Sequence, residues 1–202
     1  MLITALKSIE EFRAIADMKT VIVSCEGCKE VYFPEIEAKL LYGELTAMSP
    51  DIKVIYLDYV CNPENLAVQT SSHLESIGLA NKMLVFSCGV GVQSVCEMFP
   101  STHVFAGCDT LALPGAQGVT PLEVDCAGCG QCYLNYTGGI CPIALCSKSL
   151  INGQCGGCKD GKCEVDHEMD CAWALIYSRL EELELLHNLN YEAKLRNYAP
   201  SP

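Results

Sequence analysis

The sequence has few basic residues. Its 202 residues include 13 Lys and Arg against 25 Asp and Glu, which gives a formal net charge of −12. No block or stripe of Lys and Arg is visible, so binding to the phosphate backbone of a nucleic acid is not expected. The acidity itself is explained by solubility.

Long apolar runs are also missing. No stretch reaches the roughly 18 consecutive apolar residues that identify a membrane-spanning helix, so no membrane span is expected. The first 20 residues carry Lys7, Glu10, Glu11 and Arg13, and they lack the uninterrupted apolar region of a secretory signal. We therefore expect a cytoplasmic protein.

Cysteine, in contrast, is abundant. The chain has 15 cysteines, and nine of them fall between Cys126 and Cys171, where glycine is frequent and large apolar side chains are few. Such a segment cannot offset its conformational entropy by burying side chains, so disulfides or metal must hold it together. An odd number of cysteines in a chain without a visible secretory signal favours metal.

The first 120 residues alternate short β-rich runs with longer amphipathic stretches. The strands are expected at residues 20–24, 53–58, 83–87 and 103–106, and the helices between them at 34–48, 63–77 and 90–99. Short apolar runs bounded by breakers are typical of buried parallel strands. The alternation predicts an α/β fold, a Rossmann-like parallel sheet of about four strands covered on both faces.

Cysteines follow all four expected strands. Cys25 and Cys28 form a C-x-x-C pair after the first, and Cys61, Cys88 and Cys108 follow the others. Because the carboxyl ends of parallel strands share one edge of a sheet, these side chains are expected to lie together. We predict a metal site at Cys25, Cys28, Cys61 and Cys88, with Cys108 as a substitute or bystander. Small buried hydrophobes are the alternative for these cysteines, and Cys96 is assigned to the core.

Composition changes near residue 120, after a stretch rich in Pro and Gly over residues 111–125. We therefore divide the chain into an α/β domain, 1–120, and a small irregular cysteine-rich domain, 121–202, which ends in a helix expected over 172–186. Cys126, Cys129 and Cys132 form a C-x-x-C-x-x-C run, a spacing that suits one corner of an iron–sulfur cubane. Four thiolates also suit zinc, so both metals stay open, with iron preferred.

Nucleophile–base pairs are not apparent. His73, His103, His167 and His187 are scattered and lie in no recognisable catalytic motif, so no catalytic residue is assigned. His167 is the one histidine placed among the cysteines of the second domain, where it is an alternative ligand.

Three strings in the second domain, GCGQC, TGGICPIALCSKSLINGQCGGCKDGKCEV and DCAWALIYSRL, resemble the methylenetetrahydrofolate reductase C-terminal family. SCGVGVQSV and the strand-end cysteines resemble its N-terminal half. In acetogens this family supplies the small cysteine-rich (zinc/iron–sulfur) subunit of a two-subunit reductase. Relatives often carry Ser at the position of Cys158, so Cys158 is expected not to be a ligand.

The resemblance implies an electron-transfer subunit without a catalytic site of its own. Its partner would be an FMN-containing TIM-barrel subunit that reduces methylenetetrahydrofolate in the Wood–Ljungdahl methyl branch, with ferredoxin or an NADH-oxidising subunit as electron donor. We expect two [4Fe-4S] clusters in the second domain and zinc or a further cluster at the first cysteine site. A zinc-bound structural scaffold and an adaptor for a corrinoid complex are the competing hypotheses. The cluster ligands are expected to be Cys126, Cys129, Cys132, Cys141, Cys146, Cys155, Cys163 and Cys171.

Overall fold

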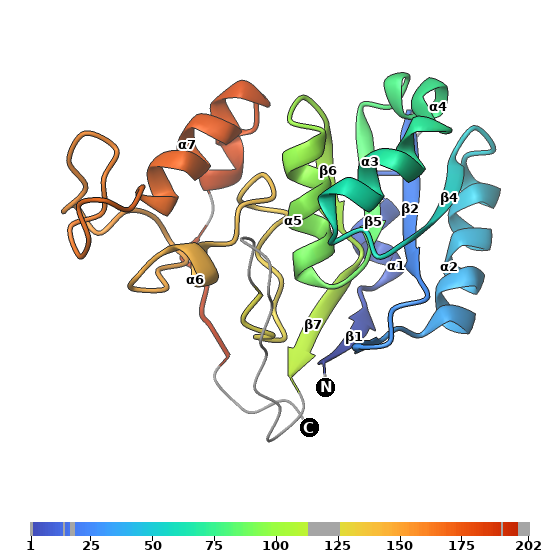
Figure 1. Cartoon of the computed structure of the whole chain (residues 1–202), viewed down its shortest axis with the longest axis horizontal. Coiled ribbons are helices and arrows are strands. Elements are labelled where there is room, and N and C mark those ends of the chain that lie inside the picture. Colours follow the sequence, from blue (N-terminus) through green and yellow to red (C-terminus); the bar gives the residue numbers. More distant parts are fainter. Residues whose placement is uncertain (1, 14, 17–18, 113–125, 191, 198–202) are drawn as a thin grey trace.

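A four-stranded parallel sheet forms the centre of the α/β part, which is the right half of the molecule in Figure 1. The computed structural model describes residues 2–13, 15–16, 19–112, 126–190 and 192–197. The strands are β2 (Thr20–Glu26), β4 (Lys53–Asp58), β5 (Lys82–Phe86) and β6 (His103–Ala106), in the order β4-β2-β5-β6. All three pairings are parallel, and Val23 faces Ile55 on one side and Val85 on the other. The predicted Rossmann-like α/β class is confirmed.

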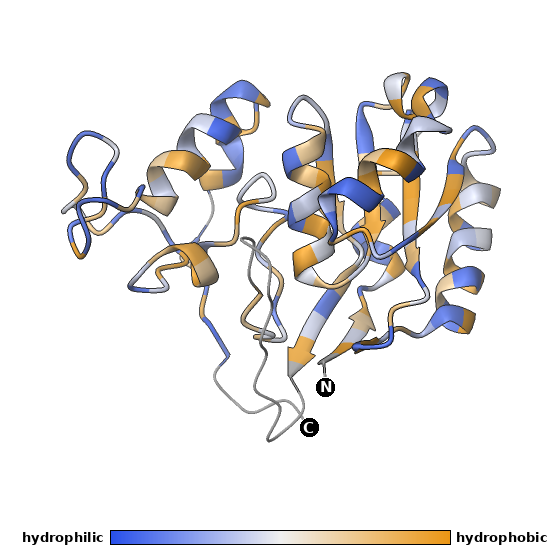
Figure 2. Ribbon diagram, in the orientation of Figure 1, coloured by the Kyte–Doolittle hydropathy of each residue, from blue (hydrophilic) through white to orange (hydrophobic). Residues whose placement is uncertain are grey.

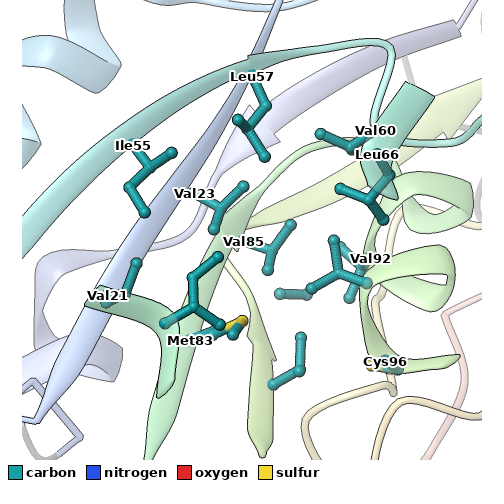
Figure 3. Close-up of a cluster of buried hydrophobic side chains, with 14 of the residues drawn as sticks. Val21, Val23, Ile55, Leu57, Val60, Leu66, Met83, Val85, Val92 and Cys96 are labelled. Atoms are coloured by element: carbon teal, nitrogen blue, oxygen red, sulfur yellow. The ribbon is translucent and has the colours of Figure 1, made fainter. Parts of the chain in front are cut away.

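Helices cover both faces of this sheet because successive strand residues point to opposite sides. Ile22 and Leu84 face α1 (Ile9–Arg13) and α2 (Glu35–Met48). Val23 and Val85 face the side of α3 (Pro63–Ser71), α4 (Leu74–Gly78) and α5 (Gly89–Met98), where the larger apolar cluster lies (Figure 3). Apolar colour is concentrated along the central strands (Figure 2). Each face of the sheet therefore carries its own core.

The helix expected over 63–77 is two helices, α3 and α4. Asn62 caps α3, because its side-chain oxygen accepts a hydrogen bond from the backbone N–H of Asn65 at 2.8 Å. The break falls in a run of hydroxyl residues, where Ser71 and Ser72 each donate to a backbone carbonyl three residues earlier. Such local bonds compete with the helical ladder and end it.

A second, three-stranded sheet was not predicted. It consists of β1 (Leu2–Leu6), β3 (Val31–Tyr32) and β7 (Cys108–Ala112), in the order β3-β1-β7. β7 pairs antiparallel with β1 and includes the first two residues of the stretch interpreted as a linker. The proposed domain boundary near residue 120 lies outside the described residues.

The cysteine-rich part is irregular apart from α6 (Pro142–Leu145), α7 (Ala172–Glu182) and a 3-10 turn, η1 (Leu186–Leu189). Trp173, Ile176 and Leu180 of α7 form its apolar cluster. The helix expected to reach residue 186 ends at Glu182, and Glu184 has a positive φ of 59°. No helix in the described part of the chain is both long and apolar enough to cross a membrane.

The cysteine-rich part packs directly on the α/β part. Leu134 is buried in the apolar cluster between the sheet and α5. The side chain of Asn135 accepts a hydrogen bond from the backbone N–H of Ala106 at 2.6 Å. From α7, Arg179 donates to the carbonyl of Gly138 at 3.2 Å and to the carbonyl of Pro100. Bonds and apolar contacts therefore join the two parts.

Candidate metal-binding thiol groups

Four cysteines gather at the carboxyl end of the central sheet. We call Cys25, Cys28, Cys61 and Cys88 the N-terminal thiol group. Cys25 is the last residue but one of β2, and Cys88 lies two residues after β5 and directly before α5. The chain runs from β2 to β4 on one side and later places β5 on the other side of β2, so this group sits at the point where the strand order reverses. Ligand sites of open α/β sheets form at that point.

Burial and mutual repulsion raise the pKa values of Cys25, Cys61 and Cys88. The pKa of Cys61 is raised to about 11, chiefly by burial and then by the nearby thiols of Cys88, Cys25 and Cys28. Burial also raises the pKa of Cys25, although hydrogen bonds from the Val60 backbone and the Ser87 side chain oppose it. The four thiols are therefore close enough to act on one another electrostatically, and their role as ligands of one metal stays a prediction.

The turn inside the C-x-x-C pair depends on Gly27. This residue has a φ of +74°, and a Cβ at its position would lie 2.6 Å from Oδ1 of Asp58. Both the left-handed backbone and the close carboxylate require glycine. The turn returns the chain so that Cys28 approaches Cys25 and Cys88.

A second set of thiols, the central thiol group, consists of Cys126, Cys129, Cys132 and Cys141. All four line one cavity of about 20 Å³, which is about the space of one water molecule. Burial raises the pKa of Cys126 to about 11, against hydrogen bonding from the backbone of Gly128. The three cysteines of the C-x-x-C-x-x-C run therefore line the same cavity as Cys141, which directly precedes Pro142.

An ion pair supports the central thiol group. Oδ1 of Asp109 accepts a hydrogen bond from the backbone N–H of Cys132 at 2.8 Å and lies 2.9 Å from Nζ of Lys7. The Lys7 side chain is only 9% exposed, so this charge is close to the thiol and shielded from water. Burial raises the pKa of Cys132, and Lys7 opposes that rise.

The C-terminal thiol group contains five cysteines, Cys146, Cys155, Cys158, Cys163 and Cys171. They line another cavity of about 20 Å³, together with Lys148 and Glu164, which form an ion pair. The pKa of Cys163 is lowered by hydrogen bonds, first from the backbone of Val165 and then from the Ser147 hydroxyl. Cys158 is hydrogen-bonded to Cys171. Cys158, expected to be a bystander, thus lies inside the group.

Backbone hydrogen bonds hold the loops of the C-terminal thiol group. The backbone N–H of Cys171 donates to the carbonyl of Gly161 at 2.7 Å, and that of Cys163 donates to Met169 at 2.9 Å. Gly153, Gly156 and Gly161 have positive φ values, and a Cβ added at any of them would meet no atom within 4 Å. These three positions therefore border open space, whereas Gly157 in the same loop is packed against the Glu164 side chain.

Short structural links connect the three groups. Gly89, the residue after Cys88, is so close to Cys126 that an added Cβ would lie 2.7 Å from its sulfur. At the other side, Cys141 precedes the single turn of α6 and Cys146 follows it. The N-terminal, central and C-terminal groups thus succeed one another across the molecule.

The remaining cysteines lie in the apolar cores. Cys96 is 6% exposed and packs on the α5 side of the sheet, as its assignment to the core predicts. Cys108 is 1% exposed and belongs to the cluster on the opposite face, and its thiol still interacts electrostatically with those of Cys132 and Cys88.

The structure supplies groupings that the sequence did not. Spacing left open which cysteines of the second domain share a site, and the two cavities divide the nine into four and five. Within the described ranges, no three Cys, His, Asp or Glu side chains are placed to hold a single metal ion. The three groups are thus defined by the region that each surrounds, and their identity as ligands stays a prediction. The Lys7–Asp109 pair gave no sequence signal, because its two members are about 100 residues apart.

Histidine is not part of these cavities. Among the described residues, the lining of the central and C-terminal cavities includes none of the four histidines. Nε2 of His103 lies 2.9 Å from the carbonyl of Leu183, which joins β6 to the end of α7. The role of His103 here is therefore structural.

Comparison with known proteins gives one match. A family described as "Methylene-tetrahydrofolate reductase C terminal" matches residues 105–199, the segment that holds the central and C-terminal thiol groups. No curated protein matches the chain. No solved structure matches it either. The family match agrees with the resemblance found in the sequence.

Proposed function

We propose that this protein is the iron–sulfur electron-transfer subunit of a methylenetetrahydrofolate reductase. The proposal is supported by the match of residues 105–199 to the methylene-tetrahydrofolate reductase C-terminal family. The partner of the protein would be an FMN-containing TIM-barrel subunit that reduces methylenetetrahydrofolate to methyltetrahydrofolate in the cytoplasm. Ferredoxin or an NADH-oxidising subunit would donate the electrons. The observation that carries this proposal is the arrangement of the thiols in three successive groups.

The donor chemistry fits such clusters. Cysteine thiolates are the ligands of iron–sulfur clusters, and sets of four also bind zinc. The central thiol group contains four cysteines and the C-terminal group five, so each has enough thiols for one cluster. When bound, a cluster supplies reversible one-electron transfer at a potential that the protein adjusts.

The surroundings of each thiol group would adjust that chemistry. Hydrogen bonds to cysteine sulfur come from the backbone of Val60 in the N-terminal group, Gly128 in the central group and Val165 in the C-terminal group. Such bonds stabilise negative charge on sulfur, and burial opposes it. Since a metal binds only the thiolate, loading must release protons from thiols whose pKa values burial has raised.

A second candidate, the zinc-bound structural scaffold, rests on cavity size. The central and C-terminal cavities each measure about 20 Å³, which is closer to the space of a single ion than to that of a cubane. A cubane would require the loops of these groups to move outwards. The open space around Gly153, Gly156 and Gly161 provides for such movement at the C-terminal group.

Metal analysis distinguishes the two candidates. The full chain is purified anaerobically. Its content of iron, zinc and acid-labile sulfide is then measured, and low-temperature EPR spectra are recorded after dithionite reduction. Reducible cubane signals with matching iron and sulfide are expected. A colourless preparation that contains zinc alone would establish the scaffold instead. Co-purification with a flavin-containing reductase subunit tests the partner.

A further inference from the structure

Residues 192–197 contact the loops of both the central and the C-terminal thiol groups, and we call this segment the strap. It is irregular along its whole length, and most of its residues are exposed. Its large apolar side chain, Leu195, is 89% exposed and therefore contributes little to holding the segment in place. Polar contacts with the two loops fix the course of the strap instead.

One attachment of the strap is to the loop that leads into the C-terminal thiol group. The side chain of Asn152 donates to the carbonyl of Lys194 at 2.9 Å and accepts from its backbone N–H at 2.8 Å. One amide thus satisfies both backbone groups of a strap residue, as a neighbouring β-strand would. Because Asn152 lies three residues before Cys155, this pair of bonds joins the strap to the C-terminal thiol group.

Other attachments are to the segment of the central thiol group. Nζ of Lys194 lies 3.6 Å from the centre of the Tyr136 ring, a cation–π contact. The backbone N–H of Asn197 donates to Oε1 of Gln131 at 2.8 Å. Gln131 lies inside the C-x-x-C-x-x-C run and lines the central cavity together with its cysteines. The strap therefore reaches the turn that carries the central thiols.

Gln131 also contacts one of these thiols through its backbone. Its carbonyl accepts a hydrogen bond from the Cys129 thiol at 3.2 Å. Since a metal binds the thiolate, loading removes the proton of this bond, and the turn then depends on its other contacts. The backbone N–H groups of Gly130 and Cys132 donate to residues of β7, each at 2.8 Å. The strap adds the bond to the side chain between them.

We propose that the strap is a positioning segment that couples the central and C-terminal thiol groups. It holds the Gln131 turn against the loop before Cys155, so the order of one group depends on a contact made at the other. This inference rests on the proposed metal-binding role of the two groups and adds a dependence between them. Release of the strap at Asn152 loosens the turn that carries Cys129, although Asn152 belongs to the loop of the other group.

Hydrogen exchange of the full-length protein tests this coupling. Asn152→Ala removes both bonds to Lys194, and exchange of the strap amides should rise by roughly 5-fold or more, the change that corresponds to two lost hydrogen bonds. Exchange at Gly130 and Cys132 should rise with it. Unchanged exchange at these two amides would overturn the proposal, whether or not the strap amides exchange faster.

A control and a reciprocal variant locate the effect. Ser149→Ala removes a hydrogen bond of the same region, from its hydroxyl to the carbonyl of Ile143 at 3.1 Å, and should leave the central turn as in the wild type. Coupling is reciprocal, so Gln131→Ala should raise exchange of the Lys194 amide, which Asn152 holds. A Lys194 amide that keeps its wild-type exchange rate in Gln131→Ala would contradict the coupling.

Metal release gives an independent measurement. The loaded proteins are mixed anaerobically with excess 4-(2-pyridylazo)resorcinol, and metal transfer to this chelator is followed by absorbance. Asn152→Ala and Gln131→Ala should lose metal faster than the wild type and Ser149→Ala, and equal rates in all four proteins would count against the proposal. Exchange is measured with and without metal, so a protein that lacks iron overturns the electron-transfer function while the exchange results still decide on the strap.

Discussion

Gly89 and Cys126 are in direct contact, and the contact joins the N-terminal and central thiol groups. A Cβ at Gly89 would lie 2.7 Å from the Cys126 sulfur, and the backbone N–H of Gly89 donates to the Thr110 hydroxyl at 2.9 Å. The helix that begins after Cys88 therefore starts against the loop of the second group. Any side chain at residue 89 has to displace a candidate ligand.

Gly89→Ala should disturb that contact. We expect a loss of about 1 to 3 kcal/mol in the free energy of unfolding, the usual cost of overpacking, and a lower metal content. Gly43→Ala is the control, because an added Cβ there meets no atom within 4 Å and lies inside α2. The free energy of unfolding of this control variant should rise by roughly 0.5 to 1 kcal/mol, because alanine is favoured over glycine inside a helix. Denaturant titration gives the free energy of unfolding of both variants, and metal analysis gives their metal content. Equal changes in the two variants would show that the contact between residue 89 and Cys126 is unimportant.

Cys158→Ser tests the composition of the C-terminal thiol group. Since four thiolates complete a cluster, the fifth cysteine is dispensable, and we expect the variant to retain its full metal content. Cys171→Ser should lose the metal of this group. Both residues line the same cavity, so the pair is a matched comparison.

The opposite result has a definite meaning. If Cys158→Ser loses metal and Cys146→Ser keeps it, Cys158 is a ligand and Cys146 is the extra thiol. Cys146 packs on the apolar cluster of α7, which would explain its retention as a hydrophobic residue.

Asp109→Asn should weaken the support of the central thiol group. The substitution removes the shorter ion pair of Lys7 and leaves it the longer one with Glu11, 3.5 Å, while the amide oxygen can still accept from the backbone N–H of Cys132. We expect a cost of about 1 to 3 kcal/mol in unfolding free energy. Asp170→Asn breaks an exposed pair with Lys162 of similar length, 2.7 Å, and should cost less than about 1 kcal/mol. Chemical denaturation of the two variants provides the comparison.

Arg179→Met should loosen the packing between α7 and the α/β part. The side chain is 9% exposed and donates to carbonyls of Gly138 and Pro100, so its loss should cost about 1.5 to 3 kcal/mol. Arg13→Met removes an arginine from an exposed pair with Glu10 and should change stability little. Hydrogen exchange at α7 amides should rise in the first variant, and unchanged exchange there would argue against the coupling.

Much of the α/β part was predictable because its signals are local. Runs such as residues 20–24 and 83–87 contain β-rich residues between breakers, and they form β2 and β5. The gathering of Cys25 and Cys88 follows from parallel strands alone. By contrast, β3 is only two residues long and pairs with β1 from about 30 residues away. Nothing local in such a segment reveals its partner.

The cysteine-rich part was less predictable because backbone conformation and long-range contacts fix it. The loop that brings Cys155, Cys163 and Cys171 together contains Asp160, which adopts a positive φ of 50°. Spacing therefore left the division of the cysteines between the two sites open. The direct contact of Leu134 with the α/β core was equally hidden, because one apolar residue next to a cysteine run carries no signal of its destination.

Leu134 follows Cys132 by two positions, and it fills part of the core beneath α5. The segment that carries the central thiols is thus anchored in the sheet itself. A chain cut before this segment would expose an open hydrophobic gap beneath α5. Folding of the segment that carries the central thiols and completion of the core beneath α5 are consequently a single assembly step.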